Sequence, residues 1–247
     1  MSRREQDPTA LVEPVLARRL VAHLDLTDLR TGLDAGAAGE LAGRAHTPFG
    51  PVAGVCVRPD AVAALRSCLA GTRLVAVVNF PGGDLDPGEV LDEARAALDA
   101  GADELDLVFP WRAYQAGDVL AGPRLVAAVA RLAPTKVILE TGAWRDTGIL
   151  LGAARASLAA GAVMLKTATG MRADSVRFDD FTLLAAAAVE TPGHGVKISG
   201  GVDVALATAA LLYAESLFGD RLSAMDFRIG ASRLLDELLG APVEGGY

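Results

Sequence analysis

Residues 135–167 read TKVILETGAWRDTGILLGAARASLAAGAVMLKT, and this stretch decides the fold class. It opens with a β-branched apolar run (135–140), continues through an Ala- and Leu-rich segment that stops at a glycine (147–161), and ends in a second apolar run (163–167). A strand, a helix and a strand within about 30 residues are typical of a βαβ unit with parallel strands.

The same alternation of strand and helix repeats along the whole chain. The strand-like runs are residues 21–27, 51–57, 73–80, 104–109, 135–140, 163–167, 195–199 and 226–230. The clearest helical segments between them are 87–101, 122–133, 147–161 and 203–219, several of which end in glycine. Eight such runs in 247 residues predict an α/β fold of the (β/α)8 TIM barrel class, and a doubly wound sheet is the alternative.

We expect residues 1–247 to form a single domain, because no low-complexity linker divides the chain. Residues 1–20 read as an N-terminal helical extension before the first strand. Residues 241–247 end in VEGGY and read as a mobile C-terminal tail.

Composition excludes several classes of function. A net charge of -8 and a pI near 4.9 argue against nucleic-acid binding, and the apolar runs are too short for a membrane span or a signal peptide. Two cysteines, Cys56 and Cys68, and three scattered histidines lack metal-ligand spacing. We therefore expect a cytoplasmic protein without a metal site.

Successive side chains of a strand point to opposite faces, and in the predicted strands the ionisable residues nearly all lie on one face while the other face is apolar. Since the apolar side must face the helices, these residues should point into the barrel, as should His23, Cys56 and Glu140. Those late in their strands, where barrel enzymes place catalytic groups, are Asp25, Asn79, Asp106, Lys166 and Lys197. Those early in their strands are Glu104, Lys136, Asp226 and Arg228, which we interpret as a buried ion-pair network at the bottom of the barrel.

Lysine is rare in this chain, which has 20 arginines and 3 lysines. Only lysine can lose its proton near neutral pH and attack a carbonyl, so each lysine is a candidate for Schiff-base chemistry. Lys166 and Lys197 come from neighbouring predicted strands, and Asp106 could move protons between the intermediates. Spacing alone leaves open which lysine is the nucleophile.

Glycine-containing turns follow the last three predicted strands. The first ends at Gly170, the second contains Gly200 and Gly201, and the third contains Gly230 and Ser232. Backbone N–H groups in such turns and at helix N-termini bind phosphate, and this is the usual phosphate site of the fold. The turns therefore favour a phosphorylated substrate.

Seven short motifs occur in an order that resembles the deoxyribose-phosphate aldolase family. They are LDLTDL, NFPGG, GADELDLVFPWRA, KVILETG, LKTATG, VKISGG and RIGAS, between about Leu24 and Ser232. The resemblance implies a class I aldolase of (β/α)8 fold that reversibly cleaves 2-deoxy-D-ribose 5-phosphate to D-glyceraldehyde 3-phosphate and acetaldehyde without metal or organic cofactor. By this resemblance, Lys166 forms the Schiff base and Asp106 is the proton relay. Lys197 is then the neighbouring cation that promotes loss of the proton from Lys166.

Further expectations follow from the same resemblance. Asp25, Asn79 and Thr167 lie in matching motifs and are assigned to substrate binding, together with the glycine turns. Tyr247 matches a C-terminal tyrosine that folds over the site in some family members and helps proton exchange. The chain departs from some relatives at Met171 and Arg233, which puts phosphate affinity in question.

Two other functions are alternatives. One is a Schiff-base aldolase that acts on a different sugar phosphate, since fold does not fix substrate. The other is a non-catalytic barrel that binds a phosphorylated sugar. The presence of Lys166, Lys197 and Asp106 together argues against this alternative. Leu- and Ala-rich helices favour a homodimer.

Overall fold

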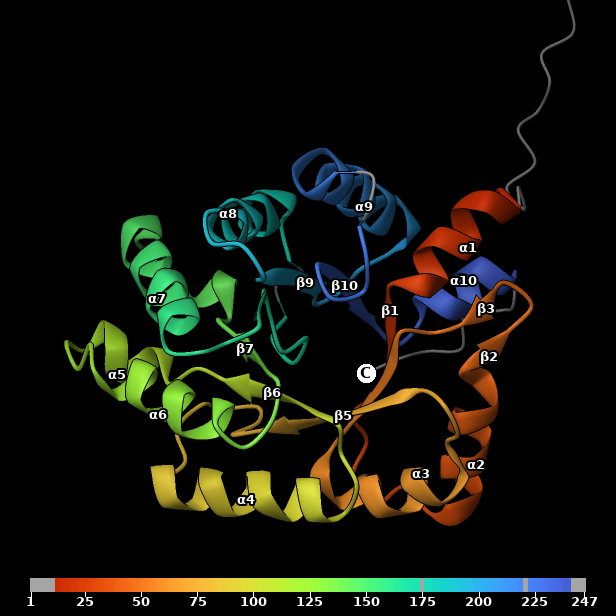
Figure 1. Cartoon of the computed structure of the whole chain (residues 1–247), viewed down its shortest axis with the longest axis horizontal. Coiled ribbons are helices and arrows are strands. Elements are labelled where there is room, and N and C mark those ends of the chain that lie inside the picture. The colour runs from red at the N-terminus through yellow and green to blue at the C-terminus, as the bar shows by residue number, and fades with distance from the viewer. Residues whose placement is uncertain (1–11, 174–175, 220–221, 241–247) are drawn as a thin grey trace, which may run out of the picture.

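Eight parallel strands close into a barrel in the computed structural model, which describes residues 12–173, 176–219 and 222–240 (Figure 1). The order around the barrel is β1-β10-β9-β8-β7-β6-β5-β4, and β4 pairs with β1. The strands are β1 (Leu24–Asp28), β4 (Gly54–Val57), β5 (Arg73–Val78), β6 (Glu104–Val108), β7 (Thr135–Ile138), β8 (Met164–Lys166), β9 (Gly195–Ser199) and β10 (Phe227–Ala231). The (β/α)8 prediction is confirmed, and the doubly wound alternative is wrong.

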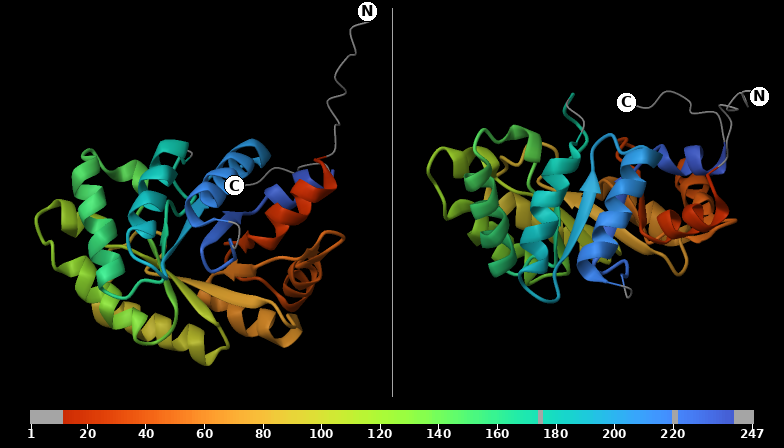
Figure 2. Two further views of the ribbon diagram at one scale, coloured as in Figure 1. Left: turned by 45° about the horizontal axis from the view of Figure 1, so that its top comes forward. Right: turned by 90° about the horizontal axis from the view of Figure 1, so that it is seen from above.

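Helices surround the barrel on its outer side (Figure 2). They are α1 (Pro14–Ala22), α2 (Ala35–Arg44), α3 (Val62–Cys68), α4 (Pro87–Asp99), α5 (Trp111–Gln115), α6 (Ala121–Ala130), α7 (Thr147–Ala159), α8 (Phe178–Val189), α9 (Val204–Phe218) and α10 (Leu234–Leu239). A small antiparallel pair, β2 (His46–Thr47) and β3 (Gly50–Pro51), connects α2 to β4. Asp86, Asp146 and Asp203 cap α4, α7 and α9 by accepting backbone N–H groups, which explains where these helices begin.

The two faces of the strands have different environments. Outward side chains such as Leu105, Leu165 and Ile198 belong to the large core between strands and helices. A second, smaller apolar cluster lies inside the barrel and consists of Cys56, Val75, Val77, Phe80, Val108 and Ile138. Because these residues come from β4 to β7 and the segments after them, part of the barrel interior is apolar and the charged groups occupy the remainder.

The N-terminal part of the chain contains a helix before β1, as expected. Helix α1 buries Ala17, Leu20 and Val21, and its Arg19 forms an ion pair with Glu215 of α9. Residues 1–11 of the predicted extension and the predicted tail 241–247 lie outside the described residues. The single domain and the tail stay predictions.

Two residues expected inside the barrel lie elsewhere. His23 ends α1 and its ring packs against Phe227, which belongs to the outer core. Asp226 precedes β10 and accepts hydrogen bonds from the backbone N–H and hydroxyl of Ser223. Both residues sit just outside a strand, where the alternation of faces no longer applies.

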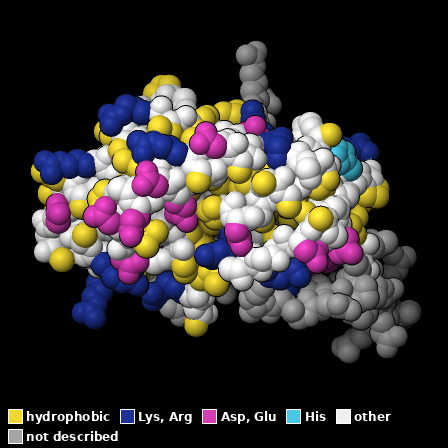
Figure 3. All heavy atoms as spheres, turned by 90° about the horizontal axis from the view of Figure 1, so that it is seen from below, with side chains coloured by type: hydrophobic (Ala, Val, Ile, Leu, Met, Phe, Trp, Pro, Cys, Tyr) yellow, Lys and Arg dark blue, Asp and Glu magenta, His cyan; other side chains and the backbone are white. Residues whose placement is uncertain are grey.

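The surface mixes charges of both signs. Figure 3 shows acidic and basic side chains interspersed over the face seen from below. None of the helices in the described ranges has the length and apolar character that crossing a bilayer requires.

Gly122 of α6 is a glycine that packing requires. A Cβ placed there would lie 2.0 Å from the buried ring of Phe109. We expect Gly122→Ala to lower the free energy of unfolding by about 1–3 kcal/mol, because the ring has to move. Gly39→Ala in α2, where no atom lies within 4 Å, is the matched control. It should raise stability by roughly 0.5–1 kcal/mol. Urea unfolding measures both, and a Gly122→Ala protein as stable as the parent contradicts the prediction.

Candidate active site

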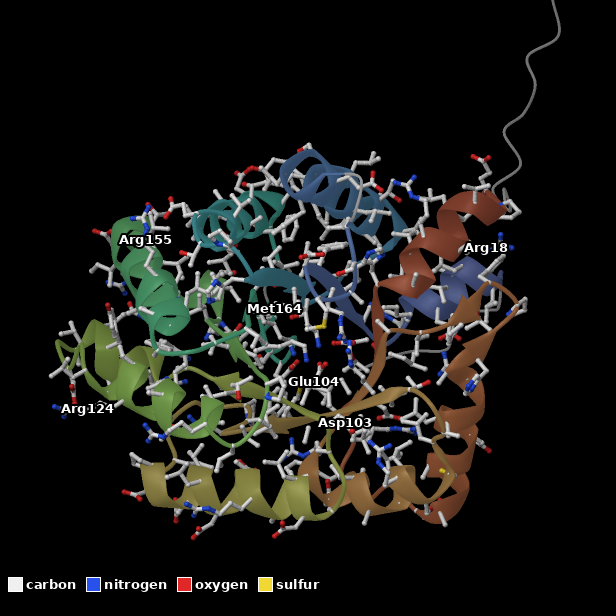
Figure 4. All side chains as sticks on the ribbon, viewed as in Figure 1. Arg18, Asp103, Glu104, Arg124, Arg155 and Met164 are labelled. Atoms are coloured by element: carbon white, nitrogen blue, oxygen red, sulfur yellow. The ribbon has the colours of Figure 1, made fainter. Side chains whose placement is uncertain are left out.

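Six charged side chains form a closed ring of alternating sign inside the barrel, which we call the charge ring. Its contacts are Lys197–Asp25 at 2.6 Å, Lys197–Asp106 at 2.8 Å, Lys136–Asp106 at 3.0 Å, Lys136–Glu104 at 2.6 Å, Arg228–Glu104 at 3.3 Å and Arg228–Asp25 at 2.5 Å. Glu104 lies within the outline of the barrel in Figure 4, whereas Arg18 and Arg155 lie on outer helices. Three anions and three cations make the charge ring neutral overall.

Burial makes this pairing obligatory, since the side chains of the charge ring are at most 8% exposed. Burial alone would raise the pKa of Asp25 and Asp106, but the adjacent cations hold both pKa values well below the ordinary range. Burial alone would lower the pKa of Lys197, but Asp106 and Asp25 raise it instead. The carboxylates therefore stay ionised, and Lys197 stays a cation.

Lys166 is a seventh charged group that lies outside the charge ring. Its Nζ is 2.8 Å from Oδ2 of Asp106, the oxygen that Lys197 also contacts. Every cation of the charge ring contacts two carboxylates, whereas Asp106 is the one carboxylate within ion-pair distance of Lys166 among the described residues. Lys166 thus contacts fewer carboxylates than any cation of the charge ring does.

A cavity of about 180 Å³ opens at the carboxyl ends of the strands, and the buried Lys166 is one of its lining residues. Among the residues predicted to bind substrate, those of the three glycine-containing turns line the cavity. The lining residues from those turns are Gly170, Gly200, Gly201, Gly230 and Ser232. Gly170 and Gly200 have positive φ and approach each other closely, so a side chain at either position would be strained. The structure therefore brings together the predicted lysine and the predicted phosphate turns.

Several predicted residues do not line this cavity. Asp25, Asp106 and Lys197 lie behind Lys166 in the charge ring. Asn79 has φ 57°, donates its side-chain amide to the Val108 carbonyl and accepts the N–H of Leu85. It therefore holds the loop after β5.

Thr167 is also turned away from the cavity. Its hydroxyl donates to the carbonyl of Ser199 and accepts the N–H of the same residue. This pair of bonds ties the segment after β8 to β9. Tyr247 lies outside the described residues.

Four further residues, Glu140, Asp203, Glu237 and Arg233, shape the site in ways that the sequence did not predict. Glu140 has φ 52° and accepts the N–H of Thr169, which fixes the loop after Lys166. Asp203 and Glu237 line the cavity and accept the N–H groups of Leu206 and Val204 at the start of α9. Arg233 lines the cavity beside them. Glu237 comes from another helix, and no local pattern signals its approach to α9.

Cys56 belongs to the inner apolar cluster and lies close to the charged groups. Its Sγ is 3.8 Å from Oδ2 of Asp106, and burial raises the pKa of its thiol. A neutral thiol is the form that suits this position. Among the described residues, no three His, Cys, Asp or Glu side chains are grouped as ligands of a metal ion would be.

The charge ring makes a testable contribution to stability through Asp25. Asp25→Asn should lower the free energy of unfolding by about 3–5 kcal/mol at neutral pH, because Lys197 and Arg228 lose a carboxylate. Since the pKa of Asp25 is lowered by folding, this stabilisation is complete above the unfolded value of ~3.9 and is lost as pH falls through the folded value. In urea unfolding, the difference between the two proteins should be constant above about pH 5 and shrink below about pH 4. If the difference in free energy of unfolding between the parent chain and Asp25→Asn is the same at pH 3 as at pH 7, the prediction is wrong.

Comparisons with known proteins show the family of the chain. No protein-family model matches the chain. The deoxyribose-phosphate aldolase of Agrobacterium fabrum (strain C58) is 38% identical over 232 residues, which cover 90% of this chain and 90% of the relative. A Toxoplasma gondii ME49 crystal structure described as a deoxyribose-phosphate aldolase superposes with a TM-score of 0.82 at 28% identity, covering 92% of this chain and 93% of that one. The deoxyribose phosphate aldolase of Aeropyrum pernix, described as tetrameric, gives a TM-score of 0.73 at 27% identity, covering 90% and 91%. The chain therefore belongs to the deoxyribose-phosphate aldolase family and is an aldolase of the lyase class.

Proposed function

We propose that this aldolase reversibly cleaves 2-deoxy-D-ribose 5-phosphate into acetaldehyde and D-glyceraldehyde 3-phosphate through a Schiff base on Lys166. The observation that carries the proposal is the position of Lys166. Of the seven charged groups described above, it alone lines the cavity, and it stands outside the neutral charge ring. A nucleophilic amine must both reach the substrate and be able to lose its proton.

The charge balance favours Lys166 over Lys197 as the nucleophile. Loss of a proton from Lys197 would leave Asp25 and Asp106 each short of a cation in a buried site. Loss of a proton from Lys166 leaves every carboxylate with the partners of the charge ring. Lys197 then acts as a permanent cation beside the reacting amine, which disfavours a second positive charge there.

The proposed cleavage follows from these positions. The neutral amine of Lys166 adds to C1 of the open-chain substrate and gives a carbinolamine, which loses water to form an iminium ion. Removal of the proton from the C3 hydroxyl then breaks the C2–C3 bond. The bonding electrons neutralise the iminium, so that an enamine and D-glyceraldehyde 3-phosphate are formed. Protonation of the enamine at its terminal carbon and hydrolysis release acetaldehyde and restore the amine.

Asp106 is the proposed proton relay for the carbinolamine. Its Oδ2 lies 2.8 Å from Nζ of Lys166, where the carbinolamine forms. Because Lys136 and Lys197 hold Asp106 ionised, it can accept a proton from the bound amine or a neighbouring water only transiently, and it returns the proton during dehydration.

The phosphate of the substrate is proposed to lie at the glycine end of the cavity. Gly170, Gly201, Ser232 and Arg233 line the cavity, and we propose that backbone N–H groups of the first three and the charge of Arg233 bind the phosphate. Asp203 and Glu237 line the same end, but each accepts a backbone N–H of α9. Substrate affinity is thus set by a balance between Arg233 and two carboxylates. A cytoplasmic location and a homodimer stay predictions from the sequence.

A Schiff-base aldolase for a different sugar phosphate is the alternative, because the catalytic groups would be the same. Product analysis distinguishes them. Incubation with 2-deoxy-D-ribose 5-phosphate should release equal amounts of acetaldehyde and D-glyceraldehyde 3-phosphate, and absence of acetaldehyde would exclude the proposed substrate.

Borohydride trapping tests the role of Lys166. Reduction in the presence of acetaldehyde should add mass to the peptide that contains Lys166 and leave those of Lys136 and Lys197 unmodified. The mass should be absent from Lys166→Arg, whose cleavage rate should fall by roughly 10³-fold or more. Since the chain has only three lysines, peptide mapping identifies the site without ambiguity. Modification at Lys197 would reverse the assigned roles.

We propose that Tyr247 assists proton exchange at the terminal carbon of the enamine. The glycines before it, Gly245 and Gly246, would let the last residue reach the cavity. Deletion of Tyr247 should slow deuterium exchange into the acetaldehyde methyl group by roughly 10²-fold, with a smaller effect on KM. Tyr247→Phe, which keeps the ring and removes the hydroxyl, should match the deletion. An exchange rate equal to that of the full chain would remove Tyr247 from the mechanism.

A further inference from the structure

The charge on Lys166 is linked to residues that do not reach the cavity. Arg228 and Glu104 complete the charge ring on the side away from Lys166, and neither lines the cavity. Arg228 is 1% exposed and Glu104 is 6% exposed. Because the site is buried, a change in charge at either residue is weakly screened at Lys166.

The groups that face Lys166 and the far side of the charge ring come from six strands. Around Lys166 they are Asp106 from β6, Lys197 from β9, Lys136 from β7, Cys56 from β4 and Asp25 from β1. Around Arg228 and Glu104 they are Asp25, Lys136, His23 before β1, and Arg73 at the start of β5, whose Nε is 3.2 Å from Glu104. Arg73 is 46% exposed, so solvent screens its charge more strongly.

We propose that Arg228 and Glu104 are remote positioning residues that set, in opposite directions, how readily Lys166 gives up its proton to become the nucleophile. The proposal rests on the proposed function of Lys166. With all six members present the charge ring is neutral, and a protonated Lys166 is the excess positive charge. The two substitutions proposed below change this excess charge in opposite directions.

Each substitution changes this balance by one charge. Arg228→Met gives the charge ring a net negative charge, which a protonated Lys166 then neutralises. Glu104→Gln gives the charge ring a net positive charge, which repels the proton on Lys166. In both variants the remaining carboxylates keep at least one cation, since Asp25 keeps Lys197 and Asp106 keeps all three lysines.

The test measures the rate of borohydride trapping with acetaldehyde from pH 5 to pH 10 and records the pH at half of the maximal rate. Relative to the parent chain, Arg228→Met should move this midpoint up, and Glu104→Gln should move it down, each by on the order of one pH unit. The double variant should return close to the parent midpoint. Arg228→Lys, which keeps the charge, should leave the midpoint unshifted.

Arg155→Met is the matched control, because it removes the same charge from an exposed ion pair with Glu190. It should leave the midpoint where it is in the parent chain. Circular dichroism and thermal unfolding establish that each variant is folded. If Arg228→Met does not fold, the midpoint of Glu104→Gln alone tests the proposal. A residue that only stabilises the fold gives no reason for the trapping midpoint to move to lower pH.

The outcomes separate the two proposals. Absence of trapping at Lys166 in the parent chain would overturn the proposed function. Normal trapping in the parent with unshifted midpoints, or with shifts in the same direction for Arg228→Met and Glu104→Gln, would overturn the inference and leave the function intact. Opposite shifts that cancel in the double variant support it.

Discussion

One carboxylate, that of Asp106, contacts all three lysines of the chain. Lys136 lies against one oxygen, and Lys166 and Lys197 lie against the other. A single negative charge cannot balance three positive charges in a buried site, so Asp25 and Glu104 supply two more. Arg228 pairs with both of these carboxylates, and a protonated Lys166 is then the one positive charge in excess. The composition of the barrel interior follows from this constraint. Well-packed apolar side chains of similar volume can fill such a space with equal stability, so the charges are not required by packing alone.

Much of the fold could be predicted from the sequence because it rests on local patterns. The strand runs, the capping aspartates and the glycine stops mark each βα unit, and the alternation of faces sends Glu104, Asp106, Lys166 and Lys197 inward. His23 and Asp226 were placed wrongly because each lies one residue beyond a strand, where a period of two has no meaning.

The charge ring itself could not be predicted. The sequence divides its members into an upper group with Asp25, Asp106 and Lys197 and a lower group with Glu104, Lys136 and Arg228. The stagger of strands in a barrel brings the two groups within ion-pair distance, since Lys136 bridges Asp106 and Glu104. Glu237 illustrates the same limit in a loop region, because its contact with the N-terminus of α9 joins residues 33 positions apart. Spacing likewise could not choose between Lys166 and Lys197, whereas the number of carboxylates that each one contacts distinguishes them.

The confinement of lysine to the barrel interior also determines which surface groups an aldehyde can modify. Lys136, Lys166 and Lys197 are at most 2% exposed, and the rest of the basic residues are arginines. Guanidinium groups stay protonated at physiological pH and do not form imines as amines do. Apart from its N-terminus, the outer surface thus offers no primary amine to a reactive carbonyl. Aldehydes would therefore form few imine adducts on this surface, and amine-directed labels would leave its exterior largely unmarked.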